Sequence, residues 1–299
     1  MLFDNYNKFI KTKLSEISKK NQFRILKVTK RKKNNYVIYN EKKLLSFACN
    51  DYLSLSTDKR LVKASAKAGL LYGTGSGASR LITGNNPLNK ELEEELSLMK
   101  NTEACLVFGS GFLANIGAVS ALANKNDLVL IDSLSHSSSF LGAKLTSAKV
   151  IKFKHNCMVD LEKKLLNYRK KFKKCFILTE GVFSMDGDIA YQDKISALKD
   201  KYNALFILDD AHGLGVIGDG TGSNSIFKKK SNVDVYIGTL SKAVGSYGGF
   251  VCGNKKLIEY LVNRCRTQIY TTGLPPAILA ASLKGIKIIR SNFNLVKKP

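Results

Sequence analysis

The sequence predicts an α/β protein in which helices cover both faces of a largely parallel β-sheet. From Ala104 onward, short apolar segments typical of buried strands alternate with longer segments of helical periodicity. This alternation is typical of parallel sheets, because consecutive parallel strands need a crossover connection between them. The chain has 299 residues, of which 44% are hydrophobic and 24% charged, as in an ordinary globular protein with one large core.

Seven segments are predicted to form the strands of a mostly parallel seven-stranded sheet: 104–108, 128–132, 149–153, 175–179, 205–209, 233–239 and 249–252. Helices are predicted at about 58–72, 112–123, 137–146, 159–172, 193–202, 254–266 and 276–290. A further helix begins with Asn86 as its N-cap and Pro87 at its first position, and it continues to about Met99.

Three regions are expected along the chain. Residues 1–48 are predicted to form an N-terminal segment with an amphipathic helix at 4–20 and a hairpin at 36–47. Residues 49–290 are predicted to form the large domain. Residues 291–299 are expected to be the start of a truncated C-terminal domain.

The composition narrows the classes of partner. The formal net charge is +24, but the lysines are spread along the chain and no aromatic residues interleave the basic runs, so a nucleic-acid partner is not expected. A positive field favours anionic substrates instead. No apolar segment approaches the ~20 residues that cross a bilayer, and six scattered cysteines with three histidines do not suggest disulfides or a metal cluster. We therefore expect a cytoplasmic protein with no membrane partner and no metal.

One lysine differs in its setting from the others. Lys242 follows a predicted buried strand within the segment GTLSKAVG at 238–245, where small residues let a bulky group approach the backbone. A partly desolvated amine there loses its proton near neutral pH and can attack a carbonyl. Lys242 is therefore predicted to bind pyridoxal phosphate, which also requires a phosphate site, a partner for the ring nitrogen and a group stacked on the ring.

Other strand ends carry residues that suit such a cofactor, although each has a structural alternative. The helix start near Gly111 offers free N–H groups to a phosphate, but the same sequence suits a tight turn. Asp209 ends an apolar strand and could hold a pyridinium nitrogen or form an ordinary ion pair. His212 could contact the phenolate oxygen of the cofactor or hold its loop. His136 could stack on the ring or be a satisfied loop residue, and Ser184 could donate a hydrogen bond.

Long motifs resemble the α-oxoamine synthases, which are pyridoxal-phosphate enzymes of the aspartate-aminotransferase fold (fold type I). These motifs are NDYL at 50–53, GTGSG at 73–77, TEGVFSMDG at 179–187, DDAHG at 209–213, GTLSKA at 238–243 and YTTGLPP at 270–276. The resemblance implies that Lys242 bonds to the cofactor aldehyde, Asp209 pairs with the ring nitrogen and His136 stacks on the ring. It also implies a homodimer, and it implies cofactor contacts from Gly111, Phe112, Ser184, His212 and Thr239, with Thr271 and Thr272 contributed by the second subunit.

The resemblance also implies a reaction. The most similar branch of the family condenses L-alanine with pimeloyl-CoA or a pimeloyl acyl-carrier protein, and it releases carbon dioxide, the free thiol and 8-amino-7-oxononanoate for biotin synthesis. Arg24 and His136 match the substrate contacts. The alternatives are glycine-using members (2-amino-3-ketobutyrate CoA ligase or 5-aminolevulinate synthase) and a non-catalytic partner subunit. Because family members continue into a C-terminal domain, we expect this chain to bind cofactor but to turn over poorly.

Overall fold

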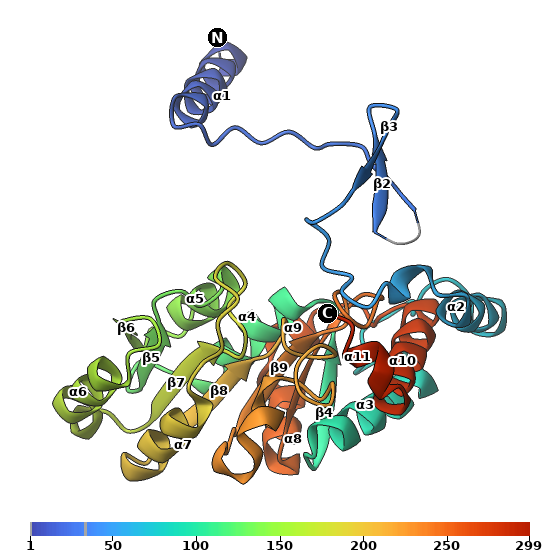
Figure 1. Ribbon diagram of the computed structural model, residues 1–299. Helices are drawn as coiled ribbons and strands as arrows, with labels where there is room; N and C mark the ends of the chain where they lie inside the picture. The colour runs from blue at the N-terminus through green and yellow to red at the C-terminus, as the bar shows by residue number, and fades with distance from the viewer. Residues whose placement is uncertain (1, 33–34) are drawn as a thin grey trace. The chain divides into compact units, whose positions relative to one another are not determined.

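The computed structural model describes residues 2–32 and 35–299, which form two compact units, 1–49 and 50–299 (Figure 1). In the first unit, α1 (Leu2–Lys19) precedes a three-stranded antiparallel sheet of β1 (Lys30–Arg31), β2 (Tyr36–Tyr39) and β3 (Lys42–Leu45). Asn40 and Glu41 connect β2 to β3 with φ angles of 47° and 63°, which suits a tight hairpin turn. The helix and hairpin predicted from the sequence are both present in this unit.

The second unit is built on a seven-stranded sheet with the order β4-β10-β9-β8-β7-β5-β6. Its strands are β4 (Ala104–Phe108), β5 (Leu128–Asp132), β6 (Lys149–Phe153), β7 (Cys175–Glu180), β8 (Leu205–Asp209), β9 (Val235–Thr239) and β10 (Gly249–Gly253). All pairings are parallel except those of β10, which runs antiparallel to both of its neighbours. The mostly parallel sheet predicted from the sequence is therefore confirmed.

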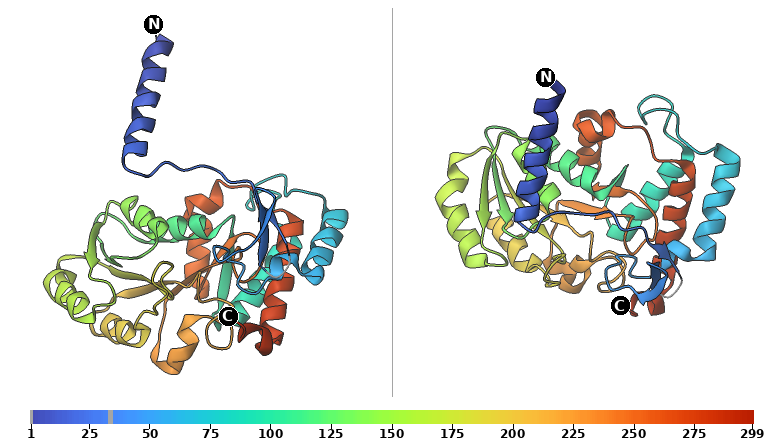
Figure 2. Two further views of the ribbon diagram at one scale, coloured as in Figure 1. Left: turned by 45° about the horizontal axis from the view of Figure 1, so that its top comes forward. Right: turned by 90° about the horizontal axis from the view of Figure 1, so that it is seen from above.

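Helices lie on both sides of this sheet (Figures 1 and 2). Successive residues of one strand enter different cores; in β7, for example, Ile177 belongs to one hydrophobic cluster and Phe176 to the other. The first cluster is covered by α2 (Lys59–Tyr72), α3 (Pro87–Lys100), α6 (Met158–Tyr168), α7 (Gln192–Lys201) and α10 (Pro276–Ser291). The second is covered by α4 (Gly111–Leu122), α5 (Ser137–Lys144) and α8 (Lys255–Arg264). Because both faces are covered, the strands read as continuous apolar segments.

A few boundaries differ from those predicted. The helix expected at 159–172 ends at Tyr168 and continues as a short 3₁₀ segment, Arg169–Lys171. The helix expected at 254–266 is divided at Cys265, whose backbone is extended, into α8 and α9 (Arg266–Ile269). A short helix, α11 (Phe293–Val296), follows α10. No helix in the described ranges is long and apolar enough to cross a membrane.

The strand register aligns the carboxyl ends of the parallel strands at one edge. Glu180 of β7 pairs with Asp209 of β8, and β9 ends nearby at Thr239. Gly249 pairs with both Thr239 and Phe108, so the start of α4 reaches the same edge. A Cβ atom on Gly249 would lie 2.4 Å from the carbonyl oxygen of Ser110, so only glycine permits this approach.

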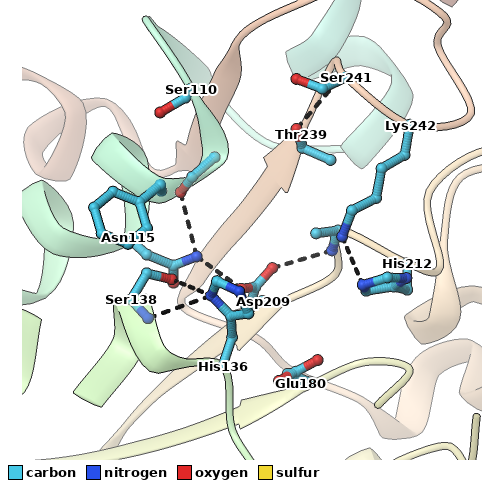
Figure 3. A pocket seen from close by; sticks show the side chains of 13 residues that line it. Ser110, Asn115, His136, Ser138, Glu180, Asp209, His212, Thr239, Ser241 and Lys242 are labelled. Carbon is cyan, nitrogen blue, oxygen red and sulfur yellow. Dashed lines mark hydrogen bonds between the residues drawn. The ribbon is translucent and has the colours of Figure 1, made fainter. Parts of the chain in front are cut away.

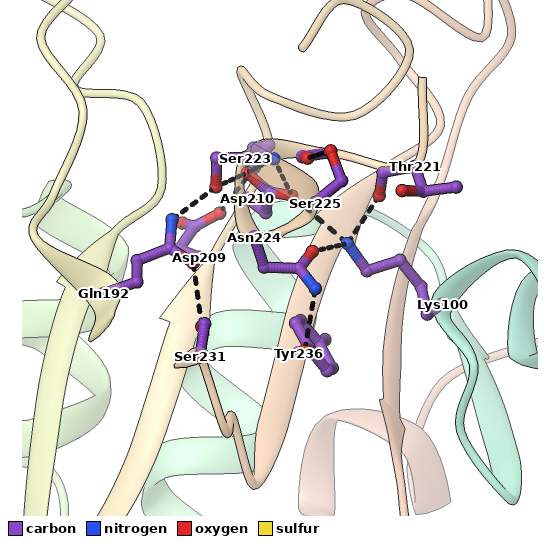
Figure 4. Close-up of polar contacts among 12 residues, drawn as sticks. Lys100, Gln192, Asp209, Asp210, Thr221, Ser223, Asn224, Ser225, Ser231 and Tyr236 are labelled. Atoms are coloured by element: carbon purple, nitrogen blue, oxygen red, sulfur yellow. Dashed lines mark hydrogen bonds and ion pairs between the residues drawn. The ribbon is translucent and has the colours of Figure 1, made fainter. Parts of the chain in front are cut away.

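A buried ion pair fixes the loop that follows β8 (Figure 4). The side chains of Lys100 and Asp210 are 1% and 2% exposed, and Lys100 Nζ lies 3.2 Å from Asp210 Oδ2. Lys100 also donates to the Thr221 carbonyl oxygen at 2.6 Å and to Asn224 Oδ1 at 3.1 Å. Ser223 donates its hydroxyl to Asp210 Oδ1 at 2.6 Å. These bonds tie the loop after Asp209 to the end of α3.

Replacing Lys100 by methionine removes one partner of this pair and leaves the buried carboxylate of Asp210 without its countercharge. We expect Lys100→Met to lower the free energy of unfolding by about 3–5 kcal/mol. The control is Lys90→Met, because the Lys90–Glu94 pair is 81% and 60% exposed with a separation of 3.8 Å, and its loss should cost less than about 0.5 kcal/mol. Urea unfolding followed by circular dichroism measures both, and equal effects of the two substitutions would contradict the structural role of the buried pair.

Candidate active site

A cavity of about 220 Å³ lies at this edge of the sheet (Figure 3). It is lined by predicted site residues from four separate segments of the chain: Gly111, Phe112, His136, Asp209, His212, Thr239 and Lys242. Its other lining residues were not predicted from the sequence: Ser110, Asn115, Ser138, Glu180, Ala211 and Ser241. The structure therefore brings the proposed lysine, acid, stacking histidine and glycine turn to one place.

One end of the cavity is the start of α4. Ser110 is the N-cap, and its hydroxyl oxygen accepts a hydrogen bond from the backbone N–H of Leu113 at 3.1 Å. The N–H groups of Gly111 and Phe112, in the first turn, have no acceptor within the helix. Thr239 and Ser241 line the same cavity, and their hydroxyls donate to the Gly248 carbonyl oxygen at 3.0 and 3.3 Å. Free N–H groups at the positive end of a helix dipole form a site for an anion.

Asp209 provides a buried acid at the end of β8. Its side chain accepts hydrogen bonds from Asn115 Nδ2 at 2.7 Å and from the Ala211 N–H at 3.1 Å. Ser139 in turn donates its hydroxyl to Asn115 Oδ1 at 3.1 Å, which fixes the amide. Burial raises the pKa of Asp209, while the bond from Asn115 and the charge of Lys242 act against this rise. A cation in the cavity would stabilise the ionised form of Asp209.

Lys242 and His212 are in direct contact. Lys242 Nζ lies 2.6 Å from His212 Nε2. Burial lowers the pKa of Lys242, and the charges of Asp209 and Glu180 partly oppose this. Burial, followed by the positive charges of Lys242 and His136, lowers the pKa of His212 to about 4. At neutral pH the imidazole of His212 is therefore uncharged, and the amine of Lys242 loses its proton more readily than an exposed lysine.

Glu180 is a second buried acid, which the sequence reasoning missed. It is 2% exposed, and within the described residues its Oε1 has no hydrogen-bond partner. Burial, followed by the charge of Asp209, raises the pKa of Glu180 to about 8, so this carboxyl group holds a proton at neutral pH. The available signal was its position, because it ends an apolar strand in the same way as Asp209. Asn115 was also detectable, as an amide within the apolar sequence of α4.

His136 is the N-cap of α5, and its Nδ1 accepts from the Ser138 backbone N–H at 3.3 Å. Four other predicted site residues do not line the cavity. Ser184 is exposed in the loop after β7. Thr271 and Thr272 follow α9, where Thr272 pairs with Ser79 in an isolated bridge. Arg24 belongs to the first unit. The roles of these four residues stay predictions.

The remaining histidine connects two loops of the site. His155 Nδ1 lies 3.0 Å from Asp132 Oδ1, and its Nε2 lies 3.0 Å from Asp188 Oδ2. Burial opposes a charge on His155, but the hydrogen bond and charge of Asp132, together with Asp188, raise its pKa. Asp132 precedes the loop of His136, and Asp188 lies in the loop of Ser184. His155 therefore uses both ring nitrogens to hold these loops together.

Comparison with known proteins gives the class and then the family. The sequence matches aminotransferase class I and II over residues 42–296. It is 44% identical to a putative 8-amino-7-oxononanoate synthase of Caulobacter vibrioides over 97% of this chain and 76% of the relative. It is 42% identical to the 8-amino-7-oxononanoate synthase of Beijerinckia indica, over 97% of this chain and 75% of that protein.

Solved structures with the same fold include members of the same enzyme classes. Serine palmitoyltransferase of Sphingomonas wittichii superposes with a TM-score of 0.88 at 30% identity, over 97% of this chain and 73% of that one. The serine palmitoyltransferase of S. paucimobilis, solved with a pyridoxal phosphate–myriocin adduct, superposes with a TM-score of 0.88 at 28% identity. The match covers 97% of this chain and 73% of that one. The 8-amino-7-oxononanoate synthase of Francisella tularensis gives 0.70 at 34% identity, over 82% of this chain and 68% of that one.

The fold and the cavity define a fold-type I, pyridoxal-phosphate-dependent transferase. The chain belongs to the aminotransferase class I and II family. Within that family its similarity to the α-oxoamine synthases, and to 8-amino-7-oxononanoate synthases among them, confirms the resemblance seen in the motifs. The expected cofactor is confirmed at the level of the family.

The raised pKa of Glu180 predicts a change of stability with pH. Because the folded chain holds this proton up to about pH 8, whereas an exposed glutamic acid releases it near 4.5, the free energy of unfolding should fall as the pH rises through this window. Glu180→Gln removes this titration, so the free energy of unfolding of the variant should not fall in the same way. Between pH 4.5 and pH 8 the parent should lose on the order of 3 kcal/mol more stability than the variant. Urea unfolding of both proteins across this range is the measurement, and parallel pH profiles would contradict the assignment.

Proposed function

We propose that this chain binds pyridoxal phosphate through Lys242 and catalyses the decarboxylative condensation of L-alanine with a pimeloyl thioester, giving 8-amino-7-oxononanoate. The observation that carries the proposal is the meeting of a partly desolvated lysine, a buried strand-end acid and a free helix N-terminus in one cavity. The names of the curated relatives support the choice of product.

The cavity fits the cofactor in its chemistry. A phosphate suits the N–H groups of Gly111 and Phe112 at the start of α4, beside Thr239 and Ser241. A protonated ring nitrogen suits Asp209, whose ionised form is otherwise disfavoured by burial. The unpartnered Oε1 of Glu180 leaves a further hydrogen-bonding atom in the cavity. The lining groups therefore complement an anion at one end and a cation in the interior.

When bound, pyridoxal phosphate supplies an aldehyde for an amino group and a ring that accepts electrons from the carbon beside that amino group. Lys242 would hold the aldehyde until the substrate displaces it, and its freed amine would remove the Cα proton of L-alanine. Asp209 would hold the proton on the ring nitrogen. His136, in the cavity wall, would lie against the ring, and His212 would donate to the ring oxygen.

The remaining assignments belong to the same proposal. Ser184 would contribute a hydrogen bond to the cofactor, and Arg24 and His136 would contact the substrates. Thr271 and Thr272 do not line the cavity of their own chain, which is compatible with a contribution to the phosphate site of a second subunit in a homodimer. The acyl group would arrive as a thioester of coenzyme A or of an acyl-carrier protein, and both carriers are anionic partners for a chain of net charge +24.

Covalent trapping tests the cofactor and the lysine together. Pyridoxal phosphate added to the purified protein and reduced with borohydride should leave a pyridoxyl group on the tryptic peptide that contains Lys242. We expect Lys242→Ala to abolish this label, whereas Lys256→Ala, on α8 outside the cavity, leaves it unchanged. Peptide mass spectrometry is the measurement. A label on several surface lysines in place of Lys242 would refute the proposal.

The amino-acid substrate is tested by adding L-alanine, glycine or L-serine to the cofactor-loaded protein. We expect L-alanine to give the largest change in the cofactor's absorbance spectrum, and to give carbon dioxide and an amino ketone when pimeloyl-CoA or a pimeloyl acyl-carrier protein is added. Asp209→Asn should reduce this rate by about 10²-fold or more, because the ring nitrogen loses its charged partner. A matched Asp160→Asn on α6 should not. A preference for glycine would move the chain to the glycine-using branch.

A further inference from the structure

Tyr52 connects a sequence motif without an assigned role to the lysine of the cavity. Its hydroxyl oxygen lies 2.7 Å from His212 Nδ1, and His212 Nε2 lies 2.6 Å from Lys242 Nζ. The three side chains come from distant parts of the second unit and form one continuous chain of hydrogen bonds. The hydroxyl also lies 3.4 Å from Asn50 Oδ1, at the side of Tyr52 that is closer to solvent. Tyr52 lies outside the lining of the cavity, and its connection to Lys242 runs through His212.

Counting protons leaves two arrangements of this chain. A neutral imidazole carries one ring proton, which resides on either nitrogen. In the first arrangement Tyr52 donates to Nδ1, and Nε2–H donates to the lone pair of an uncharged amine. In the second, an ammonium of Lys242 donates to Nε2, and Nδ1–H donates to the Tyr52 oxygen.

The surroundings favour the first arrangement. It lets the hydroxyl of Tyr52 donate across the short 2.7 Å contact with Nδ1, whereas in the second the hydroxyl donates only across the long 3.4 Å contact with Asn50 Oδ1. Burial penalises the ammonium that the second arrangement needs, and the ring of His136 faces the same cavity. Of the acids facing Lys242, Glu180 holds its own proton, and the charge of Asp209, which accepts from Asn115 and Ala211, offsets the effect of burial on the Lys242 pKa only in part.

We propose that Tyr52 is a positioning residue that selects the tautomer of His212, so that Nε2–H faces Lys242 and favours the uncharged form of its amine. The same tautomer presents an N–H donor to the cavity, where an oxygen of a bound aldehyde can accept it. The inference rests on the proposed function only in taking Lys242 as the reacting amine.

Histidine side-chain ¹⁵N NMR on the full chain without cofactor reads the tautomer directly. The chain has three histidines, so His212→Gln assigns the resonances of His212. We expect an unprotonated Nδ1 and a protonated Nε2 between pH 6 and pH 8, and we expect Tyr52→Phe to shift the population toward Nδ1–H. Tyr260→Phe is the matched control, because it removes a hydroxyl that donates to the Ala121 carbonyl oxygen at 3.1 Å outside the cavity.

A second readout follows the amine itself. Without the hydroxyl of Tyr52, Nε2 can accept from an ammonium, so the pH midpoint for borohydride trapping of pyridoxal phosphate on Lys242 should rise by about one unit in Tyr52→Phe. Tyr260→Phe should match the parent. A protonated Nδ1 in the parent, or a Tyr52→Phe variant with unchanged tautomer and unchanged midpoint, would overturn the inference. The absence of any trapping at Lys242 would count against the proposed function, while the NMR result would still decide the tautomer.

Discussion

Burial of ionisable groups at the carboxyl edge of the sheet is the constraint on which the site depends. Asp209, Glu180 and Lys242 are held where water cannot stabilise their charged forms, so the pKa of each acid rises and that of the amine falls. Each shift moves the pKa of the group toward neutral pH, where the group can release or accept a proton more readily. The same desolvation costs stability, which the two hydrophobic cores on either face of the sheet offset.

Strand register determines how these buried ionisable groups lie relative to one another. Parallel pairing places Glu180 directly beside Asp209, and the antiparallel β10 brings β4 and the start of α4 to the same edge as β9. Asn115, itself fixed by Ser139, then donates to one carboxylate oxygen of Asp209, and the Ala211 N–H donates to the other. His155 links the loops that carry His136 and Ser184. The cavity is therefore held by hydrogen bonds and backbone pairing on several elements and not by one loop.

Much of this arrangement could be predicted from the sequence because the relevant signals are local. A buried strand of a parallel sheet is a continuous apolar segment, so its end, and the polar residue that follows, can be read directly, as for Asp209 and Lys242. The strand order cannot be read this way. Nothing local indicates that β10 lies between β4 and β9, or that Asn115 reaches Asp209 across 94 positions of sequence. Tyr52 was overlooked because its role depends on such a distant contact, with His212. Glu180 was overlooked although it ends an apolar strand in the same way as Asp209.

The neighbouring acids Asp209 and Asp210 show how one dipeptide serves two purposes. The backbone N–H of Asp210 still donates to the Ile237 carbonyl oxygen at 2.8 Å, so the chain is extended there and successive side chains point in opposite directions. Asp209 consequently faces the cavity, whereas Asp210 turns away and pairs with the buried Lys100. That pair anchors the loop carrying His212, whose ring must reach both Tyr52 and Lys242. A structural ion pair on one side of the strand thus fixes the reactive groups on the other.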